Sequence, residues 1–141
     1  MPLLYRSAPG VTTSSDVAVV DIPNPNSGAN SQVVYFKVRV VAFAEPPGAP
    51  PASDDTACWT IEGAVVRDQS TDTVAFPPGS PPIVTPLYNA NPVDWDVSAV
   101  ADNPTKSLKV TVTVDGFGVG PGAAPPASFS ATIELVPAAS L

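Results

Sequence analysis

The chain has 141 residues and a net charge of −7, and 44% of its residues are apolar. This length and apolar content suit one folded domain with its own hydrophobic core, and they exclude a disordered acidic tail. The six basic residues are scattered along the sequence, so neither nucleic acid nor an anionic membrane surface is an expected partner.

The first thirteen residues differ from the rest of the chain. Leu3, Leu4 and Tyr5 are apolar, Arg6 follows them, and no alternating pattern continues beyond. A basic residue after the apolar stretch does not make a secretory signal. The sequence predicts an N-terminal arm over residues 1–13, followed by a single domain over residues 14–141. The arm is either a frayed terminus or a segment that binds a neighbouring protein, because Leu-Leu-Tyr is costly to leave in water.

The body of the chain shows the two-residue hydrophobic period of β-strands. The residues from Gln32 to Ala44 alternate between apolar residues and residues such as Lys37 and Arg39. Similar runs cover residues 58–68, 94–101, 108–115 and 129–135, with shorter strands expected at 17–22, 73–76 and 83–88. Nineteen prolines leave few windows for helices. We therefore expect an all-β protein, an antiparallel β-sandwich or jelly roll of about eight strands.

Proline-rich loops separate these strands. Pro46 and Pro47 lie in the first loop, Pro78 lies in the second, and Phe117 lies in a third that is rich in Gly, Ala and Pro. Proline is kept out of central strands, so these loops mark strand ends and sheet edges. Their stiffness limits the entropy lost on docking, which makes them candidate contact sites.

The aromatic residues fall into two groups. Trp59 and Trp95 lie on the apolar faces of their strands, so we expect them in the core. Tyr88 and Phe117 lie near loops and are candidates for contact with a partner.

The sequence offers little for catalysis. It contains no histidine and one cysteine, Cys58, whose apolar neighbours suggest an inert, buried thiol. Asp94 and Asp96 would share one strand face, and Asp54 and Asp55 lie in a loop. Their spacing matches no calcium-binding loop, so solvated surface charge is the simpler interpretation. We predict no enzymatic activity, no cofactor and no metal.

Four motifs resemble the β-rich modules of tailed-bacteriophage virion proteins, which occur in tail fibres, appendages and small head-associated proteins. They are Tyr-Phe-Lys-Val-Arg-Val at 35–40, the run from Trp59 to Asp68, Trp-Asp-Val at 95–97 and Leu-Lys-Val-Thr-Val-Thr at 108–113. The resemblance covers residues 31–136. The proline-rich stretches at 46–51, 77–82 and 121–126 depart from the pattern, which has no catalytic residues to carry over.

The resemblance implies a viral structural protein made in the host cytoplasm. Our sequence-based expectation is a capsid decoration or cement protein on the phage head surface, bound to the major capsid protein and to its own copies as a homotrimer. Its contacts would come from the arm and the loops, through many weak interfaces. Two alternatives remain: a tail-fibre or tail-tip module that binds a host receptor, and a cellular carbohydrate-binding or adhesion sandwich.

Overall fold

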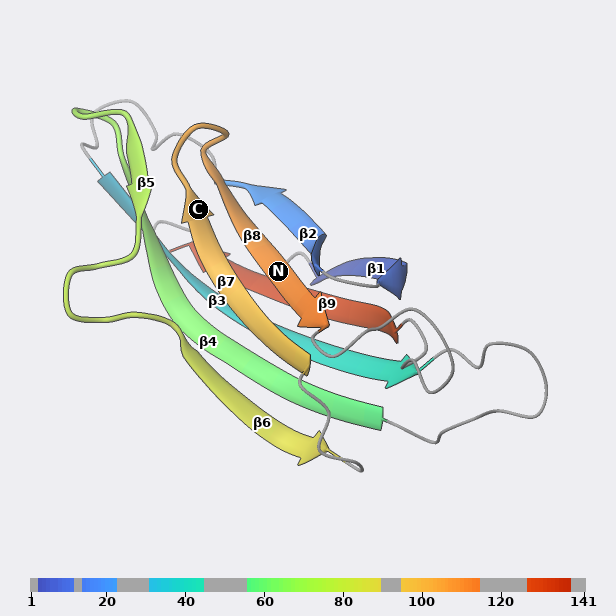
Figure 1. Ribbon diagram of the computed structural model, residues 1–141. Coiled ribbons are helices and arrows are strands. Elements are labelled where there is room, and N and C mark those ends of the chain that lie inside the picture. The colour runs from blue at the N-terminus through green and yellow to red at the C-terminus, as the bar shows by residue number, and fades with distance from the viewer. Residues whose placement is uncertain are drawn as a thin grey trace.

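The described residues form nine antiparallel strands in two sheets (Figure 1). The computed structural model describes residues 3–11, 14–22, 31–44, 56–89, 95–114 and 127–137. The large sheet has the order β1-β9-β3-β4-β5, and β6 also pairs with β4. The small sheet has the order β2-β8-β7. The large sheet comprises β1 (Leu3–Val11), β9 (Ala127–Pro137), β3 (Ser31–Ala44), β4 (Thr56–Asp68), β5 (Thr73–Ala75) and β6 (Ile83–Asn89). The small sheet comprises β2 (Ser14–Asp21), β8 (Ser107–Val114) and β7 (Trp95–Asp102).

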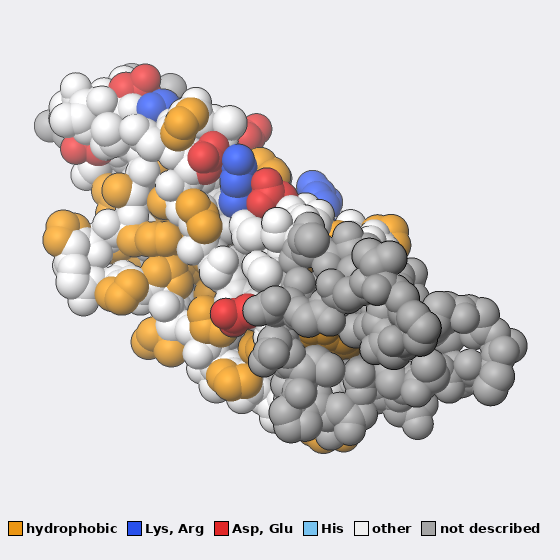
Figure 2. Space-filling view, viewed as in Figure 1, with side chains coloured by type: hydrophobic (Ala, Val, Ile, Leu, Met, Phe, Trp, Pro, Cys, Tyr) orange, Lys and Arg blue, Asp and Glu red, His pale blue; other side chains and the backbone are white. Residues whose placement is uncertain are grey.

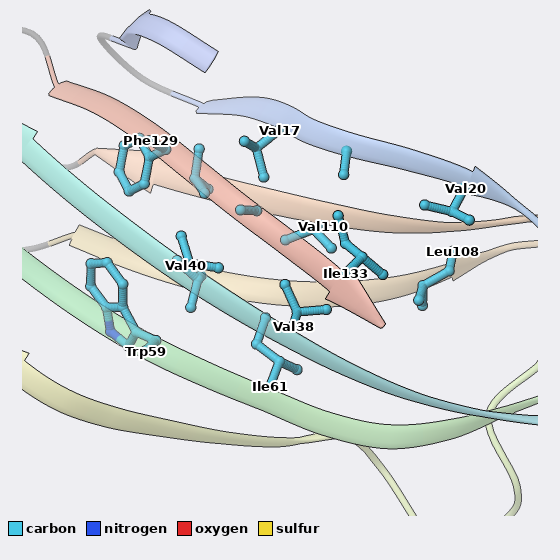
Figure 3. Close-up of a cluster of buried hydrophobic side chains, with 14 of the residues drawn as sticks. Val17, Val20, Val38, Val40, Trp59, Ile61, Leu108, Val110, Phe129 and Ile133 are labelled. Atoms are coloured by element: carbon cyan, nitrogen blue, oxygen red, sulfur yellow. The ribbon is translucent and has the colours of Figure 1, made fainter. Parts of the chain in front are cut away.

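The hydrophobic core lies between the two sheets. β2 and β8 supply Val20 and Leu108, which face Val38 of β3 and Ile133 of β9 across the core (Figure 3). Phe129 packs against both tryptophans, with ring centroids 6.3 Å from Trp59 and 6.0 Å from Trp95. The prediction that both tryptophans belong to the core is confirmed.

The alternation seen in the sequence is confirmed by burial. In β3 the even-numbered residues from Val34 to Ala42 are buried, while Tyr35 and Arg39 point outward. The same holds in β8, where Leu108, Val110 and Val112 are completely buried. The all-β sandwich is therefore confirmed, with nine strands instead of about eight.

The additional strand is β1, in the part of the chain that the sequence predicted to be an arm. Residues 3–11 pair antiparallel with β9, and Ala8 and Val11 are buried. The expectation of an arm outside the sandwich is therefore wrong for residues 3–11. Arg6 occupies the register position opposite the buried Ala131, and this charged residue interrupts the apolar alternation that would have marked a strand. Whether residues 3–6 also bind a neighbouring protein stays a prediction.

β5 and β6 share one side of β4 but leave a break between them. Val66 pairs with Ala75 and Glu62 pairs with Ile83, so residues 63–65 have no strand partner on that side. Residues 76–82 leave the edge here, as the long connection at the left of Figure 1 shows. A Cβ on Gly63 would lie only 3.2 Å from the Pro82 Cα, so glycine permits this close approach.

Candidate interaction surface

The residues predicted to make contacts are spread over several elements. Pro46, Pro47 and Phe117 lie outside the described residues. Pro78 is exposed in a turn that is closed by a 3.0 Å hydrogen bond from the Ser80 N–H to the Pro77 carbonyl. Tyr88 lies within β6 and is also exposed. Among the described residues, these two predicted contacts are on the same edge of the large sheet.

The N-terminal residues present only part of their surface to solvent. Leu4 is half-buried against the core, whereas Tyr5 and Arg6 are exposed. The Tyr5 hydroxyl donates to the Ser130 Oγ at 3.2 Å, and the Arg6 guanidinium donates to the Tyr5 carbonyl at 2.9 Å. Leu3 is placed in the strand, but its side chain lies outside the description. Of the apolar side chains attributed to an arm, Leu4 is therefore used within the chain's own fold, whereas Tyr5 stays exposed.

The β6 strand carries apolar side chains that are exposed on both of its faces. Ile83, Val84, Leu87 and Tyr88 expose between 36% and 68% of their surface. Val84 pairs with the buried Ile61 and therefore lies on the face of the large sheet that is turned toward the small sheet, yet 36% of its surface is exposed. Figure 2 shows hydrophobic side chains along this margin of the molecule, over β6 and residues 76–82. We call these four residues the β6 surface.

The outer face of the large sheet extends this apolar surface. Cys58 pairs with Tyr88 on one side and with Val41 on the other, so the three side chains form a row across β6, β4 and β3. Val41 is 54% exposed, and Phe43, two residues along the same face of β3, is 48% exposed. Apolar residues thus continue from β6 across the end of the sheet.

The predicted burial of Cys58 is wrong. The thiol is half-buried on the outer face, since Ala57 and Trp59 on either side of it both point into the core. In a strand, neighbours that face inward place the residue between them outward. Apolar sequence neighbours were therefore evidence against burial at this position.

Paired charges occupy the middle of the same outer face. The Lys37 Nζ lies 3.0 Å from the Glu62 Oε1, and the Arg39 Nη1 lies 3.8 Å from the Glu134 Oε2. The hydrogen bond and charge of Lys37 lower the pKa of Glu62 below its usual value. Two positive and two negative groups balance here, so this part of the face has no net charge, although the whole chain carries −7.

The most extensive polar cluster joins the two sheets at their other end. The Asn103 Oδ1 accepts hydrogen bonds from the Val74 N–H and the Lys106 Nζ, both at 3.0 Å. The guanidinium of Arg67, which is only 5% exposed, donates to the Asp72 Oδ1 at 2.7 Å. These contacts connect the turn after β4 to the turn after β7. The cluster therefore joins the two sheets at this end of the sandwich.

The acidic residues do not form a metal site in the part of the chain that is described. Asp54, Asp55 and Asp94 lie outside that part, and Asp96 is exposed. The Asp96 carboxylate accepts a 3.1 Å hydrogen bond from the Val97 N–H. No group of three or more potential ligands occurs among the described residues. Nor does any described helix have the length and apolar character needed to cross a membrane.

Known proteins offer little comparison for this chain. No protein family and no curated protein matches it. Among solved structures, the tailspike protein of Acinetobacter phage vB_ApiP_P1 is similar with a TM-score of 0.37 and 14% identity, over 94% of this chain and 21% of that one. The tailspike protein of Acinetobacter baumannii phage AM24 is similar with a TM-score of 0.38 and 7% identity, over 96% of this chain and 28% of that one. The chain thus spans less than a third of either tailspike protein.

Proposed function

We propose that the chain is a structural module of a bacteriophage virion that works by surface contact and not by catalysis. The β6 surface is the observation that carries this proposal, because large apolar side chains that are exposed together mark a site of protein contact. The four strand motifs that resemble phage virion modules support the viral assignment. They lie on β3 and β4 of the large sheet and on β7 and β8 of the small sheet.

A tail fibre or other tail appendage is the better-supported location within the virion. The sequence-based case for a head decoration protein depended on a free apolar arm at residues 1–13. Residues 3–11 instead form an edge strand, and Leu4, Ala8 and Val11 contribute to the core. Decoration of the capsid, with the major capsid protein as partner, remains the second candidate.

Antibody labelling of intact phage particles would test the location. Antibodies raised against the purified protein would be applied to virions of the phage that encodes it, and gold-labelled secondary antibodies would be located by negative-stain electron microscopy. Gold at the tail is the expected result, and gold over the head would favour decoration. Unlabelled particles that also lack the protein by mass spectrometry would refute a virion role.

A module that binds a host glycan is a further possibility, supported by the exposed ring of Tyr88. Aromatic side chains contribute strongly to binding surfaces because they bury a large area. Binding of the purified protein to a glycan array, lost on Tyr88→Ala substitution, would support this function. Binding that Tyr88→Ala leaves unchanged would exclude Tyr88 as the platform.

A further inference from the structure

The β6 edge combines two properties that favour association with another chain. It is apolar on both faces, and residues 73–93 contain no charged residue, although the chain is strongly acidic. A strand with these properties invites association with other chains. The question is which kind of partner, and which kind of contact, this edge accepts.

Strand addition to β6 is opposed by two features of the strand itself. Pro86 lies in the middle of β6 and has no N–H to donate to a neighbouring strand. The pairing with β4 also shifts register between Cys58 and Trp59, so that Leu87 lies outside the regular ladder. Proline and bulges protect sheet edges against pairing with a further strand. The edge is therefore suited to contact through its side chains.

Charge determines which side of one copy can meet another copy. Two chains that each carry −7 repel each other, and this repulsion is felt over about 10 Å at moderate ionic strength. The β6 surface has no charged side chain, and the adjoining outer face contains the balanced pairs Lys37–Glu62 and Arg39–Glu134. Among the described residues, the side chains of this surface therefore add little to the repulsion between two copies.

We propose that two copies of the chain pack their β6 surfaces against each other about a twofold axis. A patch that binds the same patch on a second copy produces this symmetry. The contact would cover Ile83, Leu87 and Tyr88 and extend onto Val41 and Phe43, with Cys58 beneath it. The inference deepens the proposed function, because it names the surface and the partner through which the module associates.

Measuring the mass of the full chain over a range of concentrations would test the proposal. Sedimentation and light scattering should show a reversible monomer–dimer equilibrium. Leu87→Lys and Tyr88→Lys should each weaken dimerisation at least tenfold, because a charge would be buried in an apolar contact. Val19→Lys and Val100→Lys are matched controls, since these valines are 45% and 43% exposed but lie on the small sheet. Circular dichroism would verify that each variant folds.

The single cysteine gives a second and independent measurement. Cys58 lies between Val41 and Tyr88, so its labelling by a maleimide should slow at least fivefold as protein concentration rises through the dimerisation range. In Leu87→Lys the labelling rate should not depend on concentration. A chain that stays monomeric, a dimer that both lysine variants leave intact, or a species of any other number of copies would overturn the proposal. Antibody labelling of virions would still test the proposed function in each of these cases.

Discussion

Asn103 connects two turns that are distant in the sequence. Its Oδ1 accepts from the backbone of Val74 in β5 and from the Lys106 ammonium, whose Nζ also donates to the Asp72 carbonyl. The β7–β8 turn and the β4–β5 turn belong to different sheets, so one amide side chain helps to fix how the sheets pack at this end. Removing the Asn103 amide would leave the N–H of the buried Val74 without its acceptor.

Asn103→Ala is therefore expected to lower the free energy of unfolding by about 1–3 kcal/mol, the range for leaving a buried donor unsatisfied. Urea denaturation followed by tryptophan fluorescence would measure it. Ser98→Ala, an exposed change on β7, should stay within about 0.5 kcal/mol of the unmodified chain. Equal midpoints for the two variants would show that the Asn103 contact contributes nothing.

Asp102 makes a pH-dependent contribution in the same turn. Hydrogen bonding from the Thr105 hydroxyl, and then the Thr105 N–H at 3.2 Å and the Lys109 charge, lower the pKa of Asp102 below its usual 3.8. A group whose pKa is lower in the folded state stabilises the fold above its ordinary pKa. This stabilisation is lost as the pH falls through the folded-state value.

Asp102→Asn should therefore melt at a lower temperature than the unmodified chain at pH 6, and the difference should be smaller at pH 2, where less of Asp102 is ionised. Thermal unfolding followed by circular dichroism at both pH values would show this. Thr105→Ser keeps the hydroxyl donor and should behave like the unmodified chain. A difference of the same size at both pH values would contradict the assigned cause.

At the scale of elements, Gly63 allows residues 76–82 to pass close to β4. A Cβ at this position would lie 3.0 Å from the ring of the buried Phe36 and 3.2 Å from the Pro82 backbone. Phe36 is further held by Phe76, whose ring centroid lies 6.2 Å away. Phe36 is completely buried, so its ring has little room to move away from an added methyl group.

Gly63→Ala is expected to destabilise the fold by about 1–3 kcal/mol, as overpacking of a core does. The unfolding midpoint in urea is the measurement. Ala64→Ser, at the next position and on the opposite face of β4, provides the control and should change little. A neutral Gly63→Ala would mean that residues 76–82 can shift away from the sheet at little cost.

β1 is an edge strand of the large sheet, and deleting it tests how much it contributes to stability. It pairs with β9 and buries Ala8 and Val11, so it contributes to the folded sandwich. Deleting residues 1–11 should lower the urea midpoint and promote aggregation, because it uncovers the apolar strand β9 as a sheet edge. Tyr5→Ser keeps the strand and should keep the midpoint. A deletion that unfolds like the full chain would restore the idea of a separate arm.

The sequence predicted eight of the nine strands because alternation alone marks a strand with one buried face. It missed β1, where Arg6 occupies an inward position and Pro9 and Gly10 follow. It named Tyr88 but not Ile83 or Leu87, since an apolar strand looks the same in sequence whether both of its faces are covered or bare. The exposure of β6 depends on which elements pack against it in the folded chain, and no local pattern in the sequence encodes that.

At the scale of the whole molecule, acidity and the uncharged β6 surface have opposite effects on association. Copies that carry −7 repel one another at long range, while contact at β6 gains from burial of apolar surface. Salt screens the repulsion but leaves apolar burial in place. The ionic strength therefore distinguishes this contact from one that depends on ion pairs.

Dimerisation is expected to strengthen several-fold when sodium chloride rises from about 0.02 M to about 0.5 M, over which the Debye length falls from roughly 20 Å to roughly 4 Å. Sedimentation velocity at several concentrations would give the dissociation constant at each salt level. Weaker association at high salt would point to charged contacts elsewhere on the molecule.

The position of β9 also has a consequence for how the chain is made. β9 is late in the sequence, yet it lies between β1 and β3 in the large sheet. β1 therefore has no partner in that sheet, and β3 lacks one of its two neighbours, until residues 127–137 have left the ribosome. Pairing between segments so far apart is intrinsically slow and leaves strand edges open in the meantime. We expect nascent chains that stop before residue 127 to depend on chaperones.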